Sequence, residues 1–364
     1  MNEEFFLLSH RREIALEAIR QGYDVTLVAK DTGRRAEVEA LGVRLIDLPV
    51  NPTGMNPLQE WRTFRFLWRL YRREQPDIIH HIGLKTVLWG GLAARLGGIR
   101  AAVINAISGL GITFSKEPLS LVARGILRII RFSSGKRTYF IFQNAEDHAL
   151  FLKHKVTTAD KCIFTKGSGV DLHLFAHVPV PETTPVRILF SARMVEEKGV
   201  PTLVEAAESL KADYAGRVEF LLCGGLSANP KAIRREWLEE HCDDTYIRWL
   251  GHRNDVRELL GSCHIVAFPS YYREGVPKSL IEACAVGRPI ITCDSIGCRD
   301  TVDDGDNGFL IPPHDSAALA GRLRQLIDDP QLRNRMGACS RAKAEAEFSV
   351  DEVVRKHMEL YRNA

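Results

Sequence analysis

The alternation of short β-branched runs with longer helical patterns is the feature that most constrains how this 364-residue chain folds. Parallel strands need crossover connections, and the helical segments between the runs supply them. The predicted fold class is therefore α/β, with doubly wound parallel sheets rather than a β-sandwich. At about 150 residues per domain, the length indicates two such units.

The pattern places strands and helices in two successive sets. In the first half strands are expected at 24–29, 43–48, 77–82, 101–107, 138–143 and 162–165. The helices expected among them cover 9–21, 57–73, 86–96, 118–132 and 145–153. The second set of strands is expected at 187–192, 218–223, 246–250, 264–269, 289–292 and 308–311.

The proline-rich stretch PVPETTP separates the two sets and predicts a linker at 176–185. The expected domains are then 1–175 at the N-terminus and 186–348 at the C-terminus. A capping box, Ser-Val-Asp-Glu, begins a final helix at 349–364 whose apolar face needs a partner. We expect this helix to pack back on the N-terminal domain.

Charge is unevenly distributed along the chain. Residues 1–175 carry 25 Lys and Arg against 17 Asp and Glu, a net charge of +8, whereas 176–364 carry 24 against 29, a net charge of −5. The first half therefore favours anionic partners, although it contains no recognisable nucleic-acid module. The eight cysteines include no Cys-x-x-Cys pair and read as reduced cytosolic thiols. Neither a membrane span nor a signal peptide is expected.

The segment from Tyr272 to Pro289 carries the most chemical information. A helix is expected at 277–286, with its N-terminus facing the loop that contains Glu274, and free amides at such a terminus form an anion site. The preceding strand feeds this loop, and ligands of open α/β sheets lie at the carboxyl ends of strands. Glu274 and Glu282 can reach different ends of one extended ligand, where sugar and ribose hydroxyls are natural partners. The alternative is a pair of solvated glutamates.

A second group of residues follows the strand at 187–192. Arg193 ends that strand and Lys198 precedes a helix start, so the two cations can bracket a diphosphate and neutralise charge as a leaving group departs. The alternative is a pair of ordinary surface cations.

These residues together resemble a known enzyme family. Arg193 with Lys198, the spacing of Glu274 and Glu282 within EGVPKSLIEA, GSGVD at 167–171, and GCRD at 297–300 are similar to retaining glycosyltransferases of family four, which have the GT-B fold. The motifs SHR at 9–11, DIIHH at 77–81 and NAISGLG at 105–111 resemble the bacterial branch that builds lipid-linked or capsular polysaccharides.

The resemblance implies a role for each residue. Arg193 and Lys198 would hold the nucleotide-sugar diphosphate, Glu282 the ribose and Glu274 the donor-sugar hydroxyls, and the catalytic group would be Arg193, Lys198 and Glu274. The phosphate cradle would be completed by the backbone around Gly275, Val276, Pro277, Lys278 and Ser279, in which every residue except Pro277 provides an N–H. The departing phosphate would take the acceptor proton, so neither metal nor cofactor is expected.

Three departures from the family pattern stand out. Only eight residues precede Ser9, where the family has its first strand, so we expect that strand to be missing or to be stunted at 5–8. Ser108 stands where many relatives have a catalytic histidine. Asp300 replaces the usual glutamate, and its shorter side chain is expected to make a different contact.

Acceptor-binding residues are expected in the first half. Ser9 is expected to cap a helix, which would place His10 and Arg11 where an acceptor phosphate could meet free amides. His81 ends a strand and could contact the acceptor, although a purely structural histidine is an equal alternative.

The helices expected at 57–73 and 118–132 combine apolar and arginine-rich faces and could dock on an anionic membrane, or could simply be amphipathic helices packed on the sheet. The resulting hypothesis is a cytoplasmic enzyme, peripheral on the inner face of the cell membrane. It would move a hexose or N-acetylhexosamine from a UDP-sugar to a polyprenyl-diphosphate-linked saccharide. The alternatives are a GT-B sugar-nucleotide epimerase and a non-catalytic nucleotide-sugar-binding subunit.

Overall fold

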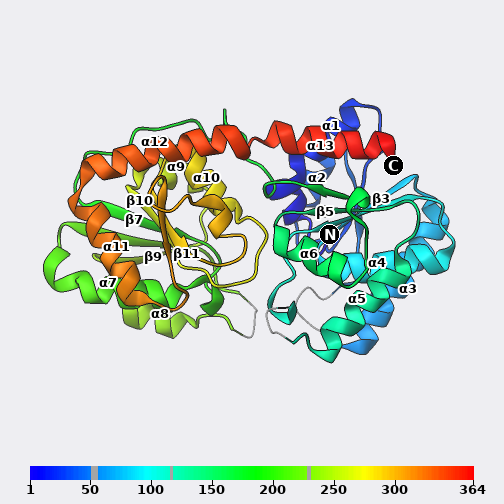
Figure 1. Ribbon diagram of the computed structural model, residues 1–364, viewed down its shortest axis with the longest axis horizontal. Helices are drawn as coiled ribbons and strands as arrows, with labels where there is room; N and C mark the ends of the chain where they lie inside the picture. The colour runs from blue at the N-terminus through cyan, green and yellow to red at the C-terminus, as the bar shows by residue number, and fades with distance from the viewer. Residues whose placement is uncertain (51–55, 115–117, 228–230) are drawn as a thin grey trace. The chain divides into compact units, whose positions relative to one another are not determined.

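The computed structural model describes residues 1–50, 56–114, 118–227 and 231–364. The chain divides into two units, unit 1 (Met1–Gly169 and Val350–Ala364) and unit 2 (Val170–Ser349). Each unit has helices packed around parallel strands, so the α/β prediction is confirmed (Figure 1). The division falls between Gly169 and Val170, and not within 176–185.

The expected linker segment is instead held to unit 2. The fully buried Arg288 guanidinium donates from Nη1 to the Val178 carbonyl at 2.9 Å. His264 Nε2 donates to the Thr183 carbonyl at 2.9 Å. Proline content marks this segment as extended chain, but composition does not indicate which buried donors its carbonyl groups satisfy.

Unit 2 contains one six-stranded parallel sheet in the order β12-β11-β10-β7-β8-β9. Its strands are β7 (Val186–Ser191), β8 (Val218–Cys223), β9 (Ile247–Gly251), β10 (Ile265–Phe268), β11 (Ile290–Cys293) and β12 (Gly308–Ile311). Its helices are α7 (Val200–Tyr214), α8 (Arg235–His241), α9 (Val256–Ser262), α10 (Lys278–Val286), α11 (Ser316–Asp328) and α12 (Pro330–Glu347). Every residue of β10 and β11 is buried, as expected for central strands covered on both faces.

Unit 1 contains two separate parallel sheets. One pairs β1 (Thr26–Ala29) with β2 (Arg44–Asp47), and the other has the order β3-β4-β5-β6. The strands of the second sheet are β3 (Ile78–Ile82), β4 (Ala102–Ile107), β5 (Thr138–Phe142) and β6 (Cys162–Phe164). The helices are α1 (Arg12–Arg20), α2 (Arg35–Ala40), α3 (Pro57–Glu74), α4 (Leu84–Gly97), α5 (Leu121–Ser133), α6 (Ala145–Lys153) and α13 (Val350–Asn363).

The first residues of the chain differ from expectation. Backbone hydrogen bonds join residues 2–4 to β1: Lys30 N–H donates to Asn2 O at 3.0 Å, and Glu4 N–H donates to Lys30 O at 3.3 Å. Residues 5–8, where a stunted strand was expected, are helical and lead into a π-helical turn, η1 (Leu7–Arg11). The strand-like pairing therefore occurs before residue 5, and the prediction for 5–8 is wrong.

The C-terminal helix α13 packs within unit 1, where it lies beside α1 (Figure 1). Val353 and Met358 of α13 are buried together with Ile14 and Ala18 of α1. The chain thus returns to unit 1 after completing unit 2, and the apolar stripe of its last helix is covered.

Candidate active site

The site residues of unit 2 lie in loops that follow the carboxyl ends of its strands. Arg193 comes directly after β7 and is exposed, and Lys198 ends a short 3₁₀ turn before α7. Gly199 caps α7 with φ +83°, and a Cβ there would lie 2.1 Å from the Pro269 carbonyl oxygen. Only glycine therefore lets the Lys198 turn approach the end of β10 this closely.

Glu274 is held on both carboxylate oxygens. Lys198 Nζ donates to Oε2 at 2.6 Å, and Ser270 Oγ donates to Oε1 at 2.9 Å. The Lys198 and Glu274 side chains are only 14% and 15% exposed, so this ion pair is partly shielded from solvent. The structure thus brings together two of the three residues predicted to be catalytic.

Tyr272 links this pair electrostatically to Arg193. Burial and the Glu274 charge raise the pKa of the Tyr272 phenol, whereas the Arg193 charge lowers it. Lys198 Nζ also lies 5.9 Å from the centre of the Tyr272 ring. The predictions from sequence did not include Tyr272 or Ser270, although both flank Glu274 in the chain, because neither has an obvious chemical role in isolation.

The predicted phosphate cradle forms the start of α10. Gly275, Val276 and Pro277 are buried, Lys278 and Ser279 begin the helix, and Pro277 at the N-cap provides no side-chain cap. Gly297, with φ +86°, brings its loop so close that a Cβ would lie 1.9 Å from the Gly275 carbonyl oxygen. The arrangement suits an anion at the helix start.

Glu282 lies one turn further along α10. Burial raises the pKa of its carboxyl group, and Lys278, with Nζ 3.6 Å from Oε1, opposes that shift. A carboxylate this shielded is suited to accepting hydrogen bonds from neutral hydroxyl groups. Unit 2 thus brings two cations and two carboxylates into the loops that follow β7 and β10 and into the first turns of α10.

The predicted acceptor residues Ser9, His10 and Arg11 lie inside η1, not at a helix start. Ser9 Oγ donates to the Phe5 carbonyl at 2.7 Å and lies 2.6 Å from His10 Nδ1, so the expected helix cap at Ser9 is wrong. The helical segment begins about one turn earlier, at Phe5. The Arg11 side chain points into unit 1, where it is 5% exposed.

His81 is also internal. It is 3% exposed, with Nδ1 2.8 Å from Asn105 Oδ1 and Nε2 3.0 Å from the Tyr71 hydroxyl. Burial lowers the pKa of its imidazole to about 4. Both ring nitrogens therefore have partners inside unit 1, which favours the structural alternative for this histidine.

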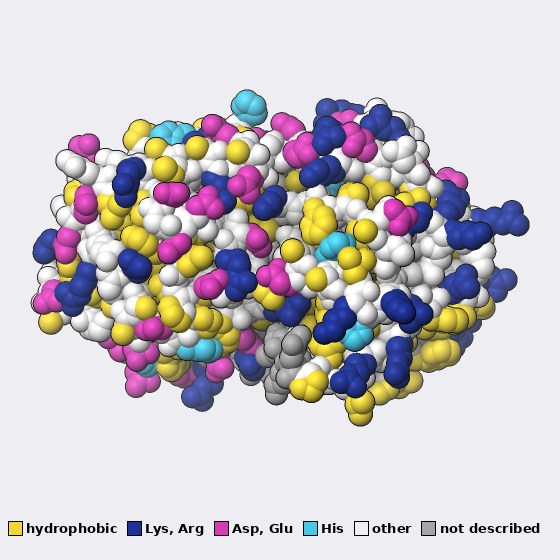
Figure 2. Space-filling model, viewed as in Figure 1, with side chains coloured by type: hydrophobic (Ala, Val, Ile, Leu, Met, Phe, Trp, Pro, Cys, Tyr) yellow, Lys and Arg dark blue, Asp and Glu magenta, His cyan; other side chains and the backbone are white. Residues whose placement is uncertain are grey.

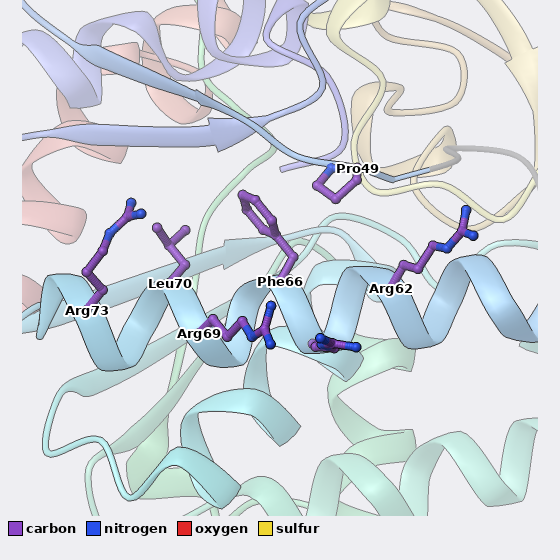
Figure 3. Close-up of a pocket in the computed structure, with 7 residues that line it drawn as sticks. Pro49, Arg62, Phe66, Arg69, Leu70 and Arg73 are labelled. Atoms are coloured by element: carbon purple, nitrogen blue, oxygen red, sulfur yellow. The ribbon is translucent and has the colours of Figure 1, made fainter.

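A basic pocket lies along α3. It has a volume of about 480 Å³ and is lined by Pro49, Arg62, Arg65, Phe66, Arg69, Leu70 and Arg73. Phe66 points toward Pro49, with Arg62 and Arg73 extended at either end (Figure 3). Among the described residues, no ion pair involves Arg62, Arg65 or Arg69. The pocket thus combines an apolar floor with four guanidinium groups, of which Arg73 is paired with Glu74, whereas the other three have no carboxylate partner within the described ranges.

The surface near this pocket is basic and partly apolar. In Figure 2, Lys and Arg side chains are spread over unit 1, with hydrophobic side chains beside them near α3 and α5. Trp61 of α3 and Leu121 of α5 are 56% and 84% exposed. No helix in the described ranges has the length and apolar character needed to cross a bilayer.

Comparisons with known proteins cover both units. The family model for glycosyl transferases group 1 matches residues 176–343, and the model for glycosyl transferase 4-like proteins matches residues 4–144.

Two curated relatives match over almost their whole length. One is N,N'-diacetylbacillosaminyl-diphospho-undecaprenol alpha-1,3-N-acetylgalactosaminyltransferase of Campylobacter jejuni, 26% identical over 97% of this chain and 94% of that protein. The other is UDP-Gal:alpha-D-GlcNAc-diphosphoundecaprenol alpha-1,3-galactosyltransferase of Escherichia coli, 24% identical over 98% and 94%.

Among solved structures, HepE from Anabaena, in complex with UDP and glucose, matches with a TM-score of 0.76, 18% identity, and coverage of 98% of this chain and 96% of that one. At this identity the likeness shows the fold alone, the two-domain GT-B architecture. Together with the two family models, it shows that the chain belongs to the group 1 and 4-like glycosyltransferases of GT-B fold.

Proposed function

We propose that this glycosyltransferase moves a hexose or N-acetylhexosamine, with retention of configuration, from a UDP-sugar to a polyprenyl-diphosphate-linked saccharide. The observation that carries the proposal is the Lys198–Glu274 ion pair before the start of α10, with Arg193 exposed in the loop that follows β7. This group offers positive charge to a diphosphate and a carboxylate to a sugar. The names of both curated relatives state a diphospho-undecaprenol acceptor, and that of the Escherichia coli enzyme states a UDP-sugar donor, which supports the proposed classes.

In this mechanism Arg193 and Lys198 bind the diphosphate and neutralise the charge that builds as the bond from the sugar C1 to the phosphate oxygen breaks. The acceptor hydroxyl oxygen forms the new bond to C1 on the same face, and its proton passes to the departing phosphate. Glu274 accepts a hydrogen bond from a hydroxyl of the donor sugar. Glu282 accepts from the ribose.

The α3 pocket supports the acceptor class. Guanidinium groups recognise phosphate oxygens through charge-assisted hydrogen bonds, and the apolar floor of Phe66, Leu70 and Pro49 suits the first isoprene units. Trp61 and Leu121 stand exposed beside arginines, as at sites that dock on anionic membranes. We therefore assign unit 1 to the lipid-linked acceptor and to the inner face of the cell membrane.

The test is UDP binding by calorimetry together with transfer to a polyprenyl-diphosphate saccharide. Arg193→Ala and Lys198→Ala should each weaken UDP binding by roughly tenfold or more and reduce transfer by roughly 100-fold. Arg187→Ala is the matched control, because Arg187 lies in β7 and pairs with Glu219. Unchanged UDP binding in both site variants would refute the diphosphate assignment. Conversion of the UDP-sugar without any acceptor would indicate an epimerase.

A further inference from the structure

Ser270 is a fully buried residue that directly follows the carboxyl end of β10. Its backbone is fixed by neighbours, because its N–H donates to Phe268 O at 2.8 Å and its carbonyl accepts from Ser295 Oγ at 2.8 Å. The side chain is not needed for either bond. The hydroxyl is therefore available for a separate purpose.

That hydroxyl has two acceptors within reach. Ser270 Oγ lies 2.9 Å from Glu274 Oε1 and 3.2 Å from the Glu197 carbonyl oxygen. A hydroxyl donates one proton, and the shorter contact to a charged oxygen is the stronger bond. The Tyr272 N–H approaches the same Oγ from the other side at 3.4 Å, which aligns the hydroxyl toward Glu274.

The two bonds to Glu274 are expected to respond differently when the nucleotide-sugar donor binds. Lys198 holds Oε2, and this is the cation that the proposed function gives to the diphosphate. When the diphosphate attracts Lys198, the bond from Lys198 to Oε2 weakens, and Oε2 can accept a hydrogen bond from a sugar hydroxyl. Ser270 is neutral and buried, so its bond to Oε1 persists in both states.

We propose that Ser270 is a positioning residue that fixes Glu274 so that Oε2 meets a hydroxyl of the donor sugar. This inference rests on the proposed function and adds a determinant of sugar recognition to it. Without the Ser270 hydroxyl, Glu274 keeps its charge but loses the bond that orients Oε1. Binding of the donor sugar should therefore weaken, while binding of UDP, which lacks the donor sugar, should not.

The experiment compares UDP with UDP-glucose, UDP-galactose and their N-acetylamino counterparts by calorimetry, and measures transfer kinetics with the best of these donors. Ser270→Ala should weaken binding of that donor about tenfold, the effect of losing one hydrogen bond to a charged group. UDP affinity should stay within about twofold of the native value. Ser270→Thr, which keeps the hydroxyl, should restore most of the donor affinity.

Ser340→Ala is the matched control. Ser340 is also fully buried in unit 2, and its hydroxyl donates to the Arg288 carbonyl at 2.8 Å. Its loss should lower thermal stability without changing the ratio of donor affinity to UDP affinity. If Ser270→Ala does not fold, Ser270→Cys, of similar size and a weak donor, takes its place.

A double-mutant cycle with Glu274→Ala decides whether Ser270 acts through Glu274. Once Glu274 is absent, Ser270→Ala should change donor affinity by no more than about twofold. Full additivity of the two effects, or equal weakening of UDP and donor, would overturn the proposal. If the native protein binds neither UDP nor any of the UDP-sugars, the proposed function itself fails, which is a different result.

Discussion

Unit 1 and unit 2 share a fold class but differ in how completely each sheet is built. In unit 2 one sheet of six strands is surrounded by a single continuous hydrophobic core. In unit 1 the strands form a pair and a separate group of four, and the described buried residues divide among several smaller clusters. Their charges differ as well, with 28 Lys and Arg against 19 Asp and Glu in unit 1, and 21 against 27 in unit 2.

The two units also differ in whether particular polar groups have hydrogen-bond partners. Around Glu274 in unit 2, charged and hydroxyl groups are matched by short hydrogen bonds at the end of a continuous sheet. In unit 1 the buried Arg11 Nε and Nη1, and the Nε2 atoms of His80 and His357, have no hydrogen-bond partner among the described residues. Unit 2 is therefore expected to tolerate little change near its site, whereas unit 1 should respond more to acid and to surface charge.

The largest expected effect follows from close packing in unit 2. Gly199→Ala would place a Cβ 2.1 Å from the Pro269 carbonyl oxygen, in a backbone conformation that side chains rarely adopt. We expect unit 2 to lose roughly 3 kcal/mol or more of unfolding free energy, measured by urea denaturation. Gly125→Ala in α5 is the control, because open space surrounds it. It should stabilise unit 1 by about 0.5–1 kcal/mol through helix propensity. If Gly199→Ala and Gly125→Ala changed the unfolding free energy equally, the expected difference in packing between the two units would be refuted.

The next effect concerns the basic surface of unit 1. Arg65→Gln with Arg69→Gln should weaken sedimentation with vesicles containing anionic lipid by about 30-fold, from about 1 kcal/mol for each basic residue. Arg235→Gln with Arg257→Gln in unit 2 changes the net charge equally and should have little effect. High salt should reduce native binding. Loss of binding in both double variants would mean that total charge, and not the α3 surface, is responsible.

The smallest effect concerns acid stability. Burial, with a smaller contribution from the Arg11 charge, lowers the pKa of His357 to about 3, whereas the same group in the unfolded chain titrates near 6.5. Between these values the unfolded chain binds more protons, so the contribution is fully present above pH 6.5 and is lost as the pH falls toward 3. The loss at pH 5 should be on the order of 1–2 kcal/mol.

His357→Leu tests this expectation, because it removes the titrating group and keeps an apolar side chain where α13 packs against His80 of β3. Thermal unfolding of the variant should depend less on pH between 6.5 and 5 than that of the native chain. His173→Gln, at an exposed position of unit 2, should leave the pH dependence of thermal unfolding unchanged. If the pH dependence of unfolding is unchanged in His357→Leu, the assignment of this acid sensitivity to His357 is contradicted.

The element pattern was largely predictable from the sequence. The helix expected at 57–73 is α3 (Pro57–Glu74), the one expected at 277–286 is α10 (Lys278–Val286), and the strand expected at 218–223 is β8. These segments satisfy local rules, such as apolar periodicity and a glycine after the helix end. The start of the chain does not follow these local rules, since residues 5–8 are apolar enough for a strand but form a helix.

The site was predictable to a lesser degree. Charged residues beside glycines and a helix start identified Arg193, Lys198 and Glu274. The same reasoning missed Ser270, because a serine after a strand has no distinctive spacing. It also treated Ser9 as a helix cap, since a cap is recognised from residue type alone and the true start depends on how residues 2–4 pair with β1.

The sequence alone determined the α/β class, the order of the elements and the charge difference between the halves, because each depends on residues close together in the chain. The tertiary structure decided which groups meet across long separations. Ser270 and Lys198 both donate hydrogen bonds to Glu274. Arg288 donates to the Val178 carbonyl. The ring nitrogens of His81 lie within hydrogen-bond distance of Asn105 and Tyr71. Such contacts depend on how strands and loops pack in space, and local residue preferences carry no information about that packing.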